Sequence, residues 1–431
     1  MKSAPLFVVL VAFLGVGCAA GNVGPGGTAG ASGGGTAGTG GAAGSSAGGG
    51  GASGSASAGH DGGMDAAGAA GTVGGGEDAG QDVGDPLMPT LLSQTGLYSD
   101  FKAKTLAPGV YPYAPKYALW SDGAKKKRWV YLPPGAKIDT DSNPDSMEFW
   151  AYPKGMKLWK EFTVTDKTGH DVVVETRLLQ KTDVGLNSWY MVAFKPNADG
   201  SDAVAVPSGE LNTMNTTHDI PTKDNCVTCH KAMWDNVLGF SALQLSKDIG
   251  ADEPSNSLNL AKVMQMGLLT TNPPGNFTLP GAATDQAALG YLHSNCGICH
   301  NIYGKAYMTD VDLDLWTHFD QIGTVQTTRA YLSMVCDVWP AGIGDGGAHD
   351  KTDPIKSCPT NHATGMPVQG NTSRLVKRIV PQMPAMSALH ELMNERGDQF
   401  SMSQMPPLAT KIVDPTGLGQ LDAWINSLPT H

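Results

Sequence analysis

The chain has 431 residues and a net charge of −11. Removing the positive charge of Lys2 and the six acidic residues of 21–85 leaves residues 86–431 with a net charge of −6. This mildly acidic balance argues against nucleic acid or an anionic lipid surface as a partner, while a basic protein partner is permitted.

Residues 1–20 have the features of a secretory signal. Lys2 precedes an apolar run that is too short to cross a membrane as a permanent helix. Cys18 lies among small residues, as does the lipidated cysteine of a bacterial lipoprotein signal, although Gly15 stands where such signals usually have leucine. We therefore expect an exported protein of the periplasm or outer membrane that touches the membrane only through a lipid anchor at Cys18. Cleavage near Ala20 is the alternative.

Residues 21–85 are nearly all glycine, alanine, serine and threonine. Such a segment cannot bury enough apolar surface to offset the entropy of ordering it, so we expect a disordered tether. The length that remains predicts one large or two medium domains. From the patterns described below we expect a β-rich domain over 90–215 and a second region over 216–431.

Short runs of β-branched and aromatic residues follow one another within 90–215. They lie at 128–132, 147–152, 158–164, 172–179 and 189–194, with glycine, proline and aspartate between them. This pattern predicts an antiparallel, sandwich-like domain. We interpret the four basic residues of 125–128 as a solvated hairpin edge.

Two copies of one short motif follow. Residues 226–230 read Cys-Val-Thr-Cys-His and residues 296–300 read Cys-Gly-Ile-Cys-His. C-x-x-C-H is the pattern of covalent c-type haem attachment, in which two thiols bind the porphyrin and the histidine binds the iron. The thiols are Cys226, Cys229, Cys296 and Cys299, and the proximal histidines are His230 and His300. The alternative, one four-thiolate zinc site, leaves the repeated histidine without a role.

The pattern around the second motif is helical. A helix beginning near residue 284 leads into Cys296, and an amphipathic helix is expected over 417–428. Between them Met405 precedes two prolines, and in cytochromes c, which this arrangement resembles, a methionine before proline commonly supplies the distal ligand. We expect Met405 to bind the second iron, with Met366 and Met383 as rivals.

The first haem has no comparable distal ligand in the sequence. Met264 and Met266 are expected to be core residues, and His218 precedes the motif without a clear role. The first iron therefore has either an unidentified ligand or an open face. The two remaining cysteines, Cys336 and Cys358, are expected to form a disulfide, with two separate thiols as the alternative.

These features together resemble a bacterial family of dihaem c-type cytochromes. The stretches that carry the resemblance are Leu-Trp-Ser-Asp-Gly-Ala at 119–124, residues 175–179, both C-x-x-C-H motifs, and residues 290–296, 370–375 and 405–407. The resemblance implies an α+β chain: a β-rich, sandwich-like N-terminal domain followed by a mostly α-helical, cytochrome c-like region with two covalently bound haem c groups.

The expected function is single-electron transfer in the cell envelope, with a redox protein as partner. One alternative is a dihaem peroxidase or oxidase with an open iron at His230. Another is a surface binding protein whose haems are accessory.

Overall fold

The computed structural model describes residues 88–143, 147–304, 313–335, 378–396, 404–407 and 410–430, and the backbone of Met366–Pro367 and Leu375–Val376. All of these belong to one compact unit, Gly80–His431. The signal, the tether and the cysteines at 18, 336 and 358 lie outside the described residues.

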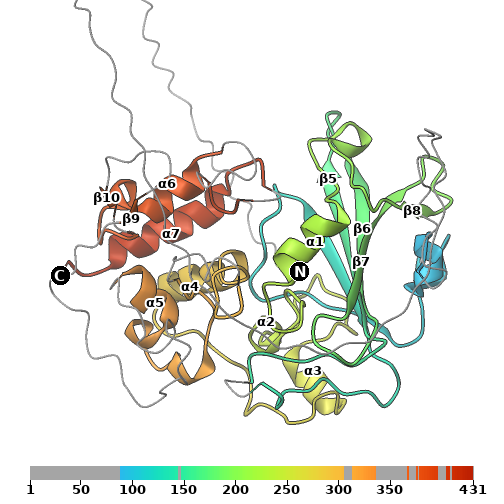
Figure 1. The fold of residues 1–431 in the computed structure, drawn as a ribbon, viewed down its shortest axis with the longest axis horizontal. Coiled ribbons are helices and arrows are strands. Elements are labelled where there is room, and N and C mark those ends of the chain that lie inside the picture. Colours follow the sequence, from blue (N-terminus) through green and yellow to red (C-terminus); the bar gives the residue numbers. More distant parts are fainter. Residues whose placement is uncertain are drawn as a thin grey trace, which may run out of the picture. The chain divides into compact units, whose positions relative to one another are not determined.

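An antiparallel sheet of six strands organises the N-terminal part of this unit (Figure 1). The strands pair in chain order: β3 (Val110–Pro112), β4 (Lys125–Tyr131), β5 (Lys157–Thr165), β6 (Asp171–Lys181), β7 (Trp189–Pro196) and β8 (Ala203–Ala205). Short connections join β5 to β6, β6 to β7 and β7 to β8, whereas longer segments join β3 to β4 and β4 to β5. At Gly169, between β5 and β6, the backbone adopts a φ of +87° that only glycine takes at no cost.

One face of the sheet packs against the segment that precedes it. Trp129, Trp159 and Leu178 are direct cross-strand neighbours on this face, and Leu92 and Leu97 cover them. Their segment holds a 3₁₀ turn (Leu92–Thr95) and the two-stranded pair β1 (Tyr98–Asp100) and β2 (Thr105–Leu106).

The expected β-sandwich is therefore wrong. Beyond the six-stranded sheet, the described residues form only β1–β2 and a pair of two-residue strands, β9 (Met366–Pro367) and β10 (Leu375–Val376). The run 147–152 is not a strand: Phe149 and Trp150 are buried from an irregular segment. Helices and loops from the C-terminal half cover the second sheet face instead, where Val130 and Leu158 pack against α2 (Ala242–Leu245) and α3 (Leu260–Gln265).

The C-terminal half is not the mostly α-helical region that was expected. Its other helices are α1 (Lys223–His230), α4 (Ala283–Asn295), α5 (Arg329–Met334), α6 (Ala388–Asn394) and α7 (Pro415–Ser427). Short 3₁₀ turns lie at Thr213–Asn215, Phe319–Gln321, Val325–Thr327 and Pro384–Met386. Helix makes up only 26% and strand 20% of the described residues. Most helices have one or two turns, because proline- and glycine-rich connections interrupt them.

The amphipathic C-terminal helix is confirmed. Leu421, Trp424 and Ile425 are buried on one face of α7, which packs on α4. The close approach depends on Gly417, where an added Cβ would lie 2.1 Å from the ring of Tyr291. None of the helices in the described part of the chain combines the length and apolar content that a membrane crossing needs.

Candidate functional site

Helix α1 carries the first C-x-x-C-H motif and lies against β7 (Figure 1). It begins after Thr222, whose hydroxyl accepts a hydrogen bond from the Asn225 amide at 3.2 Å. Cys226 and Cys229 are one turn apart, so both thiols project from neighbouring positions of one helix. Burial raises the pKa of both thiols, and the charge of Arg177 opposes this effect.

His230 is held in one tautomer by the loop that follows α1. Its Nδ1–H donates to the Asn236 carbonyl at 2.6 Å, which leaves Nε2 as the nitrogen with a free lone pair. Burial lowers the pKa of His230 to about 4, against the effect of this hydrogen bond. The imidazole is therefore neutral, and neutral imidazole is the form that binds iron.

Asp235 fixes this loop to the sheet. Its carboxylate is fully buried and forms an ion pair with Lys181 at 2.5 Å, and that ammonium is also fully buried. It accepts further hydrogen bonds from Trp189 Nε1 at 2.8 Å and from the Tyr152 amide at 2.8 Å. The position of the next residue, which accepts from His230, depends on this anchor.

The second motif follows directly from the C-terminal end of α4. Its backbone is tightly packed, because a Cβ at Gly297 would lie 2.8 Å from the carbonyl oxygens of His293 and Leu315. The ring of His300 is buried, and its Nδ1 has no hydrogen-bond partner among the described residues. Burial lowers the pKa of His300 to about 4 and raises that of Cys296 and Cys299 to about 12.

The structure brings the two motifs together. The charge of Cys229 contributes to the raised pKa of Cys299, although burial is the larger cause. One apolar cluster is shared by residues that follow the first motif, among them Met233, and by residues of the second, among them Ile298. A contact of 3.6 Å from the Asn301 amide nitrogen to the Met233 sulfur also links them.

The Leu-Trp-Ser-Asp-Gly stretch ties the sheet to the second motif. The Trp120 amide donates to the side chain of Asn295 at 2.7 Å, directly before Cys296. Asp122 accepts from the amides of Lys411 and Ile412, both at 2.9 Å. The role of this stretch is therefore to connect three parts of the fold.

The donor set fits covalently bound haem better than zinc or a redox dithiol. In the described residues, no three histidine, cysteine or acidic side chains are arranged to hold a metal ion, although all four motif thiols are described. Reactive dithiols have lowered thiol pKa values, and here the pKa values are raised. Two adjacent thiols and a neutral histidine are what each c-type haem requires.

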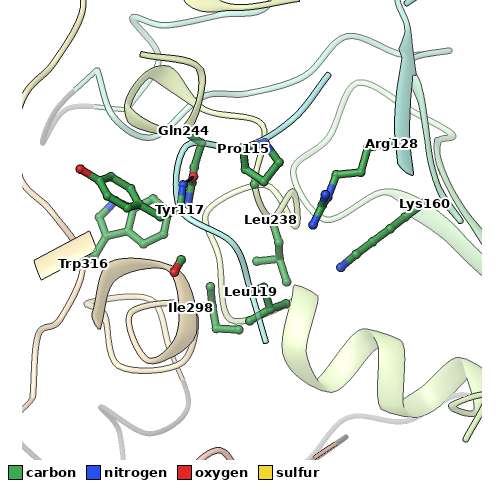
Figure 2. Close-up of a pocket in the computed structure, with 11 residues that line it drawn as sticks. Pro115, Tyr117, Leu119, Arg128, Lys160, Leu238, Gln244, Ile298 and Trp316 are labelled. Carbon is green, nitrogen blue, oxygen red and sulfur yellow. Dashed lines mark hydrogen bonds between the residues drawn. The ribbon is translucent and has the colours of Figure 1, made fainter. Parts of the chain in front are cut away.

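A pocket lies between the sheet and the second motif (Figure 2). The space among its lining residues amounts to about 380 Å³, a volume that includes open solvent and is not an enclosed cavity. Arg128 and Lys160 extend into it from β4 and β5, opposite the apolar side chains of Leu119, Leu238 and Ile298. The pocket therefore has a cationic side and an apolar side.

A second set of buried ionisable groups lies near the first motif. Glu175 accepts from Arg177 Nε at 2.9 Å and from His218 Nε2 at 2.6 Å. Burial would raise the pKa of Glu175, but the Arg177 guanidinium and His218 hold it below its ordinary value. His218 thus uses Nε2 in this bond.

Two further histidines, which the motifs do not include, lie near the second site. His293 is buried, and its Nδ1 accepts from the Thr317 amide at 3.2 Å. His318 forms ion pairs with Asp314 at 2.9 Å and Glu148 at 3.1 Å. Burial opposes the charged form of His318, but these two carboxylates raise its pKa to about 10.

The structure defines the distal iron ligands less well than the proximal histidines His230 and His300. The Met405 amide donates to the Leu392 carbonyl at 2.8 Å, and its role as an iron ligand stays a prediction. Met383 is 56% exposed, which does not favour it as a ligand. Met264 packs against the apolar core as expected, and Met266 is 42% exposed. No side-chain contact is described for Met366.

Sequence analysis missed the residues that surround the motifs. It assigned the whole basic run to a solvated edge. Strand β3 pairs only with residues 129–131 of β4, so the run does lie at an edge of the sheet, but only Lys125 and Lys127 of the run are exposed. The alternation of the run within a strand was the available signal. It places Lys126 and Arg128 on the opposite face from the exposed pair.

Comparisons with protein-family models, curated proteins and solved structures found no match.

Proposed function

We propose that the protein is an exported dihaem c-type cytochrome that passes single electrons in the cell envelope. The observation that carries the proposal is the convergence of two C-x-x-C-H motifs whose histidines are both neutral, His300 buried and His230 partly buried. Each haem, when bound, supplies an iron that exchanges one electron reversibly.

The chain's own residues have three tasks in this function. The thiol pairs hold the cofactors at positions fixed by α1 and by the end of α4. The hydrogen bond from His230 to the Asn236 carbonyl orients one proximal ligand. The shared apolar cluster around Met233 and Trp316 keeps water away from the space between the motifs. Proximity of the two sites favours transfer between them.

The location and partner are part of the same proposal. The secretory features of residues 1–20 support export, and Cys18 supports a lipid anchor. A redox protein is the partner that this function requires.

Haem counting tests the proposal. The full chain is produced in cells that attach c-type haem, and covalent haem is measured by intact mass and by the pyridine haemochrome spectrum. We expect two haems in the wild type and one in each double variant, Cys226→Ala with Cys229→Ala, or Cys296→Ala with Cys299→Ala. A wild-type protein without covalent haem would refute the proposal.

A second candidate is a peroxidase or oxidase that reacts at the first haem. The observation that favours it is the buried set of Glu175, Arg177 and His218 near Cys226, since such groups can move protons. Carbon monoxide separates the two functions. No change in the reduced spectrum indicates two closed irons and an electron carrier, whereas a shifted Soret band with peroxide turnover supports the enzyme.

A further inference from the structure

Three cations face one another across the central strands of the sheet. Arg128 of β4 is directly opposite Lys160 of β5, and Lys160 is directly opposite Arg177 of β6. Like charges in directly opposed positions destabilise a sheet. This row therefore needs counter-charges.

Only part of the charge in the row is balanced by the protein. Arg177 is paired with the buried Glu175 through two hydrogen bonds. Within the described residues, the side chains of Arg128 and Lys160 have neither a hydrogen bond nor an ion pair. The Lys160 ammonium lies 5.0 Å from the centre of the Phe162 ring, and the charge of Glu175, which already accepts from Arg177 and His218, also acts on it. Two cations thus lack an anion.

Both cations point into the pocket, whose wall includes Ile298 of the second motif (Figure 2). The charge of Lys160 acts on Cys229 and on His230 of the first motif. Opposite the cations, the pocket wall is apolar and includes Leu238, which lies in the segment that follows this motif. The pocket is thus suited to a ligand with a flat apolar body and two carboxylates.

We propose that Arg128 and Lys160 bind the two propionate carboxylates of the haem attached at Cys226 and Cys229. This inference rests on the proposed function. A guanidinium holds a carboxylate through two parallel hydrogen bonds and an ammonium holds one as a point charge, so two cations match two propionates. A cation near a haem also favours the reduced iron, because reduction removes a positive charge.

The test is the midpoint potential of each haem in the full-length holoprotein. We expect Arg128→Gln and Lys160→Gln each to lower the potential of one haem and leave the other unchanged. Lys160→Arg, which keeps the positive charge, should have the wild-type midpoint potential. The matched control is Lys127→Gln, because Lys127 lies on the same strand but on the other face, with its side chain 73% exposed and paired with Glu161 at 3.6 Å.

The haem concerned is identified in the background that lacks Cys296 and Cys299. There the effect of Lys160→Gln should persist. An effect seen only on the haem at Cys296 and Cys299 would overturn the assignment to the first haem.

Two results would overturn the inference while leaving the proposed function intact. One is a two-haem protein in which the Gln variants behave like Lys127→Gln. The other is measured on the wild type and so applies even if those variants do not fold. It is a resonance Raman spectrum whose propionate bands indicate carboxylates without hydrogen bonds. A wild type without haem would overturn the proposed function, and this inference with it.

Discussion

Replacing Asp235 by alanine tests how strongly the loop after the first motif is anchored. The substitution leaves the Lys181 ammonium fully buried without its partner at 2.5 Å. It also removes the acceptor of the Trp189 indole and of the Tyr152 amide. Breaking a buried ion pair from one side costs about 3–5 kcal/mol, and each orphaned buried donor adds about 1–3 kcal/mol.

We therefore expect Asp235→Ala to lower the free energy of unfolding by about 4 kcal/mol or more, a large part of the 5–15 kcal/mol that is typical of folded domains. Urea denaturation followed by tryptophan fluorescence measures the loss, with an unchanged m-value as the check on two-state behaviour.

The matched control is Asp183→Ala. Asp183 pairs with Lys154 at 3.6 Å, and the two side chains are 66% and 61% exposed. An exposed pair of this kind contributes little to stability. Adding Lys181→Met to Asp235→Ala should recover part of the loss, because it removes the unpaired charge. If Asp235→Ala cost no more than Asp183→Ala, the anchoring role assigned to Asp235 would be refuted.

Three further outcomes are expected. The charged His318 stabilises the fold fully below about pH 6.5 and loses this contribution as the pH rises through its folded pKa of about 10. In urea titrations, the advantage of wild type over His318→Gln should therefore shrink by a few kcal/mol between pH 6 and pH 10, and a constant difference would contradict the assigned ion pairs. Gly417→Ala should lower the melting temperature and cost about 1–3 kcal/mol by overpacking, whereas Gly419→Ala, with open space around it, should be neutral or stabilising; equal effects would exclude the close contact. Met405→Ala should lower one haem potential and make that haem bind carbon monoxide, and an unchanged spectrum would exclude Met405 as a ligand.

The motifs and most strands could be predicted because their signals are local. Covalent attachment requires particular residues within five positions, and alternation within a strand is visible in the strand itself. The runs at 128–132, 158–164, 172–179 and 189–194 correspond to β4, β5, β6 and β7 within a few residues. The run at 147–152 has the same composition, but it is a loop, and its aromatic side chains pack into two separate apolar clusters.

The rest could not be predicted because it depends on which segments meet. The opposition of Arg128 and Lys160 requires the register between two strands. The role of Asp235 requires knowing that Lys181, far away in sequence, lies beside it. The expected sandwich was wrong for the same reason: a half-buried strand shows that its face is covered, but not by what.

The Leu-Trp-Ser-Asp-Gly stretch has a consequence for the time course of folding. Asp122 accepts hydrogen bonds from Lys411 and Ile412, nearly 300 positions later in the chain. Contacts of such high sequence separation slow folding, because a long loop must close before they form. This connection between β3 and β4 therefore completes its contacts only when almost the whole chain is present.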